Sequence, residues 1–126
     1  MGIGETASCF QNVDLDLTFE EDVTPLLQAL GASLREMHRR DGFASFELRG
    51  IQPRDPDEAI EEFWRFVRAL PPGARAAWNA CRRRTMNVGV HAPSGHSVEF
   101  EVSQESVERL HELGADLVFT VYRGEE

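Results

Sequence analysis

Short stretches of this chain alternate between hydrophobic and polar residues, and longer stretches repeat hydrophobic residues at helical spacing. Val13, Leu15 and Leu17 alternate with polar residues, which is the two-residue period of a half-buried strand. The same period predicts further strands at residues 45–49, 86–91, 98–102 and 117–122.

Helical spacing predicts four helices. The first covers residues 20–30, with acids in its first turn, where the helix dipole favours them, and Gly31 as its end. The second opens at Asp55, has Pro56 in its first position and reaches about Leu70. The other two are residues 74–83 and the stretch after Ser103 that places Val107, Leu110 and Leu113 on one face.

Residues 33–40 fit two interpretations. Leu34 and Met37 continue the apolar stripe of the preceding helix, but Gly31 interrupts that stripe. The following Asp41-Gly42 pair is a hairpin signal. We therefore expect a short edge strand here, with a helical extension as the alternative.

A similar pattern occurs twice at a constant offset, which bears on the fold. The strand at residues 15–17, its helix and the Leu-Gly-Ala-Ser-Leu of residues 30–34 resemble residues 98–100, a helix and the Leu-Gly-Ala-Asp-Leu of residues 113–117. Two strand–helix–strand units predict an α+β fold of the split βαβ kind, ferredoxin-like or related, with helices mainly on one face of the sheet.

One domain is the size that 126 residues predict. We expect residues 13–126 to form it. Residues 1–12 are rich in glycine and small polar types and poor in apolar ones, which indicates a loose N-terminal tail.

The net charge of −9 is unevenly distributed, because residues 1–22 contain six acids and no base. Such a field repels nucleic acid and attracts basic proteins. We therefore expect no nucleic-acid partner and consider a basic protein as one. Solubility is the plainer explanation of the same charge.

No motif for catalysis, cofactor binding or metal binding stands out. The four histidines lie on different predicted elements without the short spacings of metal ligands. Neither a nucleophile elbow nor a dinucleotide-binding glycine loop is present. We therefore expect a protein that is not an enzyme and holds neither a cofactor nor a metal.

Two features indicate a cytoplasmic protein without membrane attachment. No run of residues approaches the length of a transmembrane helix, and the N-terminus lacks the basic start and apolar core of a leader. Cys81 falls on the apolar stripe of its predicted helix, so we expect a buried thiol rather than a disulfide with Cys9.

The C-terminal half carries a resemblance to a known family. Its features are a helix containing Trp78, an arginine-rich junction, the Asn87-Val88-Gly89 strand and a closing helix, Leu-Gly-Ala and strand that ends at Tyr122. This half resembles a bacterial family of small proteins classed as a domain of unknown function. Similar small acidic proteins are found beside polymorphic toxins as immunity proteins, which is what the resemblance implies here.

Together, the uneven charge, the missing catalytic motifs and this resemblance predict a non-catalytic immunity or antitoxin-like protein. It would bind and neutralise a basic effector or toxin through an acidic face. The helix from Pro56 adds an aromatic residue off its apolar stripe, Phe66, which either covers a neighbouring loop or anchors the partner. The predicted contacts are Asp14, Asp16, Glu20, Glu21, Asp22, Glu58, Glu62 and Phe66.

A small-molecule binding or regulatory domain is the alternative. Its anionic ligand would contact Arg82, Arg83, Arg84 and Asn87. The plainer explanation of the arginine run is that cations complement the C-terminus of a helix. A homodimer also remains open.

Overall fold

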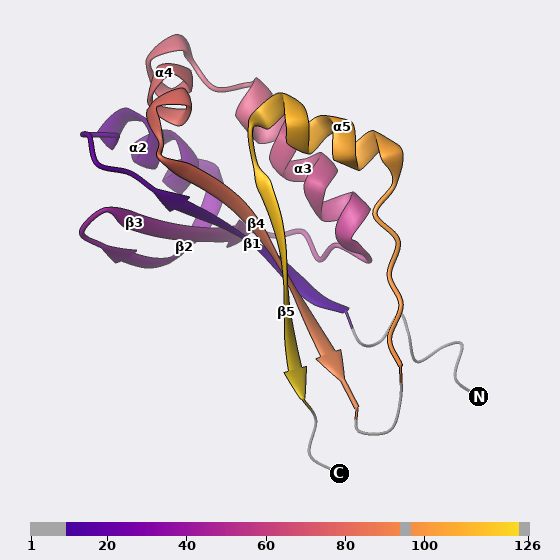
Figure 1. The fold of residues 1–126 in the computed structure, drawn as a ribbon. Helices are drawn as coiled ribbons and strands as arrows, with labels where there is room; N and C mark the ends of the chain where they lie inside the picture. Colours follow the sequence, from indigo (N-terminus) through magenta and orange to yellow (C-terminus); the bar gives the residue numbers. More distant parts are fainter. Residues whose placement is uncertain (1–9, 94–96, 124–126) are drawn as a thin grey trace.

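One mixed sheet of five strands runs through the computed structural model, which describes residues 10–93 and 97–123 (Figure 1). The strands are β1 (Phe10–Thr18), β2 (Leu34–Arg40), β3 (Phe43–Leu48), β4 (Arg83–Ala92) and β5 (Asp116–Arg123). Their order across the sheet is β2-β3-β1-β4-β5. Neighbouring strands are antiparallel except β4 and β5, which are parallel.

The connections define a split βαβ fold. Four helices are seen in the described residues: α2 (Thr24–Ser33), α3 (Pro56–Arg68), α4 (Pro72–Ala80) and α5 (Gln104–Leu113). The β1-α2-β2 unit leaves a gap between its strands, which β3 fills, and α3 and α4 lead from β3 to β4 on the far side of β1. This is the ferredoxin-like strand order. The predicted fold class is therefore confirmed, and α5 with β5 extends it by one parallel strand.

The two faces of the sheet differ in chemistry. Val13, Leu15 and Leu17 of β1 are buried in the core that the helices cover, together with Phe46 of β3 and Met86 of β4. The alternate residues of the same strands lie on the opposite side, here called the open face. Successive side chains of a strand point to opposite faces. Because the apolar residues take the covered face, the residues on the open face are mainly polar.

Residues 98–102 do not form the predicted strand. Both sides of β4 are already paired, with β1 and with β5, so β4 has no free edge for this segment. Its apolar residues still pack against the core, and the Phe100 ring meets the Phe10 ring edge-on with 6.1 Å between centroids. The alternation of residues 98–102 therefore reflects burial of one side of this segment, and not pairing in the sheet. The predicted second strand–helix–strand unit, which began with these residues, is wrong.

Element boundaries also differ from the prediction; the helix predicted at residues 74–83 is Pro72–Ala80, for example, and the strand predicted from residue 86 begins at Arg83. The first helix begins at Thr24, because Pro25 belongs in a first turn, and the acids of residues 20–22 precede it. Gly31 lies inside this helix and does not end it. β1 begins at Phe10, so residues 10–12 belong to the domain and not to a tail, while residues 1–9 lie outside the described residues.

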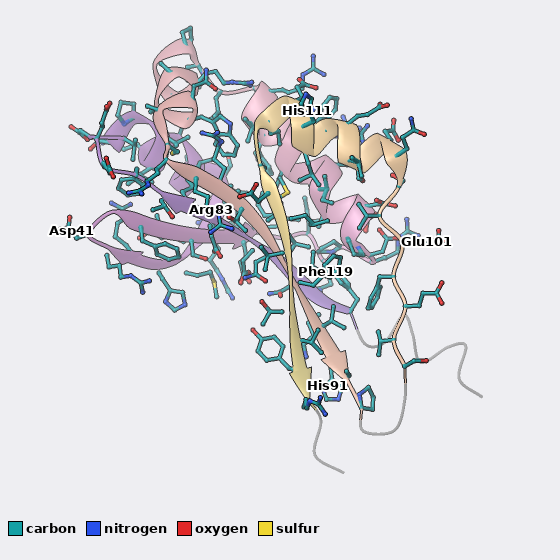
Figure 2. All side chains as sticks on the ribbon, viewed as in Figure 1. Asp41, Arg83, His91, Glu101, His111 and Phe119 are labelled. Atoms are coloured by element: carbon teal, nitrogen blue, oxygen red, sulfur yellow. The ribbon has the colours of Figure 1, made fainter. Side chains whose placement is uncertain are left out.

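The edge strand at residues 34–40 is confirmed as β2. Asp41 and Gly42 form the hairpin turn to β3, with Gly42 at a φ of 75° and Asp41 at the tip (Figure 2). The carbonyl of Gly42 accepts a hydrogen bond of 3.0 Å from the backbone N–H of Phe19. The turn is thereby held beside the segment that leaves β1.

No helix in the described part of the chain is both long enough and apolar enough to cross a bilayer.

Candidate functional site

The residues predicted to contact a partner lie in three separate places. Asp14 and Asp16 are on β1 and face the open side of the sheet. Glu20, Glu21 and Asp22 form the loop between β1 and α2. The remaining three, Glu58, Glu62 and Phe66, are on α3, which packs on the covered face.

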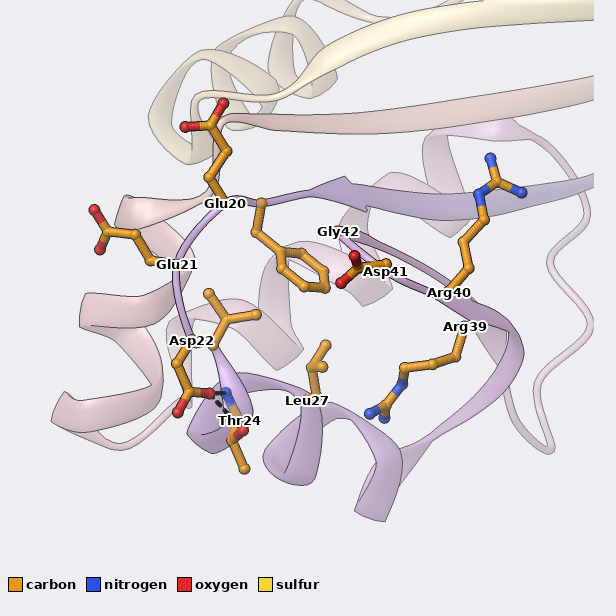
Figure 3. A pocket seen from close by; sticks show the side chains of 11 residues that line it. Glu20, Glu21, Asp22, Thr24, Leu27, Arg39, Arg40, Asp41 and Gly42 are labelled. Atoms are coloured by element: carbon orange, nitrogen blue, oxygen red, sulfur yellow. Dashed lines mark hydrogen bonds between the residues drawn. The ribbon is translucent and has the colours of Figure 1, made fainter.

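The loop of residues 20–22 forms the rim of a groove, which we call the acidic groove. It has a volume of about 620 Å³ and lies between this loop, the start of α2 and the β2–β3 hairpin (Figure 3). Phe19, Val23 and Leu27 supply its apolar side chains. Its polar lining consists of Glu20, Glu21, Asp22, Thr24, Arg39, Arg40 and Asp41.

Local hydrogen bonds position the acidic rim. Asp22 accepts a bond of 2.9 Å from the backbone N–H of Thr24, and a second from the Thr24 hydroxyl, which hold the loop to the first residue of α2. These two bonds lower the pKa of Asp22, so its negative charge is secured at neutral pH. Glu20 pairs with Arg82 at 2.6 Å, but both side chains are 70% exposed, so this surface pair holds the loop only weakly.

Four acids and two arginines line the groove, and the arginines have other partners. Arg39 bonds to Glu36 at 2.7 Å, and the guanidinium of Arg40 lies 4.5 Å from the centre of the Phe43 ring. Figure 3 shows Arg40 extending away from the groove and Asp41 pointing toward its centre. Asp41 lines the groove and forms no ion pair with any described residue.

A second acidic cluster lies at the centre of the open face. Asp14 is opposite Glu47 in the β1–β3 register, and Asp16 accepts a hydrogen bond of 2.8 Å from the Ser45 hydroxyl. Burial raises the pKa of Asp14 to about 6, and repulsion from Asp16 and Glu47 adds to the effect. The nearby His38 opposes this shift. Asp14 Oδ1 is buried without a hydrogen-bond partner among the described residues.

Two of the three predicted residues on α3, Glu58 and Phe66, have local contacts. Glu58 accepts a bond of 2.7 Å from the backbone N–H of Arg54, which lowers the pKa of the Glu58 carboxyl. Phe66 is partly buried against the hydrophobic core. Phe66 is therefore not fully exposed, which accords with its alternative interpretation as cover for neighbouring residues, and its role as a partner anchor stays a prediction.

The three arginines of the run, Arg82, Arg83 and Arg84, each contact different partners. Arg82 pairs with Glu20, as described above, and Arg83 pairs with Asp116 at 2.9 Å. Arg84 donates to the carbonyls of Trp78 at 2.8 Å, Cys81 at 3.0 Å and Gly114 at 3.0 Å. Arg84 therefore donates hydrogen bonds to carbonyl groups at the C-terminus of α4. This agrees with the prediction that the arginine run complements the end of a helix.

Asn87, the fourth residue of the predicted anion site, lies on the open face. Its Oδ1 accepts a hydrogen bond of 2.6 Å from the Thr120 hydroxyl. Arg82, Arg83, Arg84 and Asn87 thus have separate partners, and the small-molecule alternative stays a prediction.

Within the described residues, no group of three or more His, Cys, Asp or Glu side chains is arranged to hold a metal ion. His96 lies outside these residues, as does Cys9. Cys81 carries a free, buried thiol, and burial raises its pKa.

Comparisons of the chain with protein-family models, with curated proteins and with solved structures return no match. The resemblance to a bacterial domain family therefore stays a prediction.

Sequence reasoning missed Asp41, Phe19 and Leu27 as parts of a site. The Asp41-Gly42 turn was recognised as a hairpin signal, which was the available clue. Its position beside the loop of residues 20–22 depends on β3 pairing with β1, which no local pattern specifies.

Proposed function

We propose that this chain is a non-catalytic, cytoplasmic binding protein of the immunity or antitoxin kind, which neutralises a basic effector protein through its acidic groove. The observation that carries the proposal is the position of Glu20, Glu21 and Asp22 around one hollow with Asp41. These acids come from two segments far apart in the sequence. Their convergence gives a site that is more selective than a general surface charge.

The chemistry of the groove suits an arginine or lysine side chain of the partner. Carboxylates form charge-assisted hydrogen bonds with a guanidinium or ammonium group. The apolar residues Phe19, Val23 and Leu27 can pack against the methylene stem that carries this group. The net charge of −9 supports the same partner class, because it speeds the approach of a basic protein.

The test begins with a pull-down from the native cell lysate and a neutralisation assay on each basic, toxic protein that is recovered. We expect wild-type protein to abolish the toxicity of one such protein at a one-to-one ratio. The double variant Glu21→Arg, Asp41→Arg should lose this protection and weaken binding at least about 100-fold, since two repulsive contacts replace two attractive ones.

A matched control reverses two acids on another surface, Glu58→Arg with Glu62→Arg on α3. This variant has the same net charge as the groove variant, so it separates the groove from the overall field. We expect it to retain binding and to lose only part of the association rate. If the groove variant bound as tightly as the wild type, with the same salt dependence, the groove would be excluded as the interface.

A further inference from the structure

The edge strand β5 exposes three large side chains, Phe119 and Val121 on one face and Tyr122 on the other. β5 is an end strand of the sheet, and among the described residues it pairs only with β4. Phe119 is 44% exposed, Val121 57% and Tyr122 53%. Figure 2 shows Phe119 near the middle of the strand. A free strand edge with exposed apolar residues is a template for pairing with another strand.

The opposite edge of the sheet is protected against such pairing. The register of β2 with β3 shifts between Glu36 and His38, and irregularities of this kind interrupt an edge. β5 has charges only at its ends, Asp116 and Arg123, and follows β4 without a shift of register. Five of the seven residues of β2 are charged or histidine: Arg35, Glu36, His38, Arg39 and Arg40.

We propose that β5 pairs antiparallel with β5 of a second copy of this chain, so that one continuous sheet crosses a two-fold dimer. In this arrangement the open faces of the two copies lie on the same side, and directly opposed residues must share a face. A register centred on Phe119 meets this condition. It places Phe119 opposite Phe119 of the second copy and Leu117 opposite Val121 of the second copy. Leu117, Phe119 and Val121 lie on the helix-covered face of the sheet, in register with Met86, Val88 and Val90, and each of them then meets another apolar residue.

The charge of the chain favours a second copy over a basic partner at this edge. A protein with a net charge of −9 repels its own copies, so self-association requires a surface where little charge is brought together. The two end charges of β5 cancel, and Asp116 already pairs with Arg83. A basic protein has no acidic excess to meet here. The β5 dimer is independent of the function proposed for the acidic groove.

Sedimentation velocity over a concentration series tests the dimer with the full-length chain. We expect the wild type to show a monomer–dimer equilibrium. Phe119→Lys places two like charges opposite each other in an apolar row and should raise the dissociation constant at least about tenfold. The control Met37→Lys alters a residue of β2 that is 39% exposed and should leave the equilibrium unchanged. A wild type that stays monomeric, or an equal effect of both variants, would overturn the proposal.

Cysteine cross-linking tests the register without a destabilising charge. Residues directly opposed in antiparallel strands have Cα atoms about 4.5–5.5 Å apart, within reach of a disulfide. In a Cys9→Ser background, where Cys81 is buried, we expect Phe119→Cys to form a disulfide-linked dimer on mild oxidation. Val121→Cys should not, since it faces Leu117. Cross-linking through position 121 alone, or through neither position, would contradict the β5 pairing centred on Phe119.

Discussion

Asp57 and Ser106 join the N-terminal ends of two helices through a hydrogen bond of 2.6 Å between the Ser106 hydroxyl and Asp57 Oδ1. The same oxygen accepts a bond of 2.9 Å from the backbone N–H of Ser103, the residue that caps α5. One carboxylate in the first turn of α3 thus anchors the start of α5 across 46 residues of sequence. Because α5 leads directly into β5, this contact helps to position the outer strand.

We expect Asp57→Ala to lower the free energy of unfolding by about 1–2 kcal/mol. The change removes the acceptor of Ser106, which is 1% exposed, and an unsatisfied buried hydroxyl is costly. Urea unfolding at neutral pH measures the effect. The control Glu105→Ala, which removes a surface pair with Arg109 in the same helix, should cost less than about 0.5 kcal/mol. Equal effects would refute the special role of Asp57.

This contribution should depend on pH. Partial burial raises the pKa of Asp57, but the hydrogen bonds from Ser106 and Ser103 outweigh it and lower the pKa below the ordinary value of 3.8. The folded protein therefore releases this proton more readily than the unfolded chain. The stabilisation is present above pH 3.8 and is lost as the pH falls through the folded pKa. The stability difference between Asp57→Ala and the wild type should therefore narrow in that acidic range, while the part due to the lost acceptor of Ser106 remains.

Glycine substitutions test the revised end of the first helix. Gly31 lies inside α2 and a Cβ there would meet no atom within 4 Å, so Gly31→Ala should raise the free energy of unfolding by about 0.5–1 kcal/mol. Gly42→Ala should lower it by about 1–2 kcal/mol, because its φ is 75° and the new Cβ would lie 3.1 Å from the Phe19 carbonyl oxygen. Destabilisation by Gly31→Ala would restore Gly31 as a helix end.

The sequence predicted correctly those features of the fold that depend on residues close together in the chain, such as the ends of helices. Asp55 and Ser103 cap α3 and α5, and Gly114 ends α5 in a left-handed conformation, so these boundaries could be predicted. The alternation of residues 98–102 predicted a strand wrongly, because alternation reports which side is buried and says nothing about whether a sheet edge is free.

The candidate site was less predictable, because its members come together through strand order. The acids of residues 20–22 were recognised from composition, but Asp41 joins them only because β3 lies beside β1. Glu58 was grouped with them by charge, although it lies on α3 with Arg54 as its partner. Charge alone could not separate these two surfaces.

Replacing Arg82, Arg83 and Arg84 one at a time should lower the free energy of unfolding by very different amounts. We expect Arg84→Lys to lower the free energy of unfolding by about 1–2 kcal/mol, since a lysine cannot reproduce the fork that reaches three carbonyls. Arg82→Lys and Arg83→Lys should change it by less than about 0.5 kcal/mol, because each forms one exposed ion pair. Thermal unfolding of the three variants checks this order, and three equal effects would contradict it.

Asp14→Asn should stabilise the protein at neutral pH. The folded pKa of Asp14 is about 6, above the ordinary value of 3.8, so the folded protein holds this proton more tightly than the unfolded chain. Wild-type stability should therefore fall as the pH rises from 3.8 to about 6 and then level off. The variant lacks this loss and should be more stable at neutral pH by on the order of 1 kcal/mol, after allowance for solvent screening.

Two measurements check this prediction. Urea unfolding of both proteins across the acidic range should show no advantage of Asp14→Asn at the lowest pH, followed by a growing advantage up to about pH 6. NMR titration of the Asp14 carboxyl carbon should give a midpoint near that value, because burial beside Asp16 and Glu47 disfavours a third negative charge on the open face. A stability difference that is constant with pH would show that Asp14 has the same pKa in the folded protein and in the unfolded chain, which would contradict the prediction.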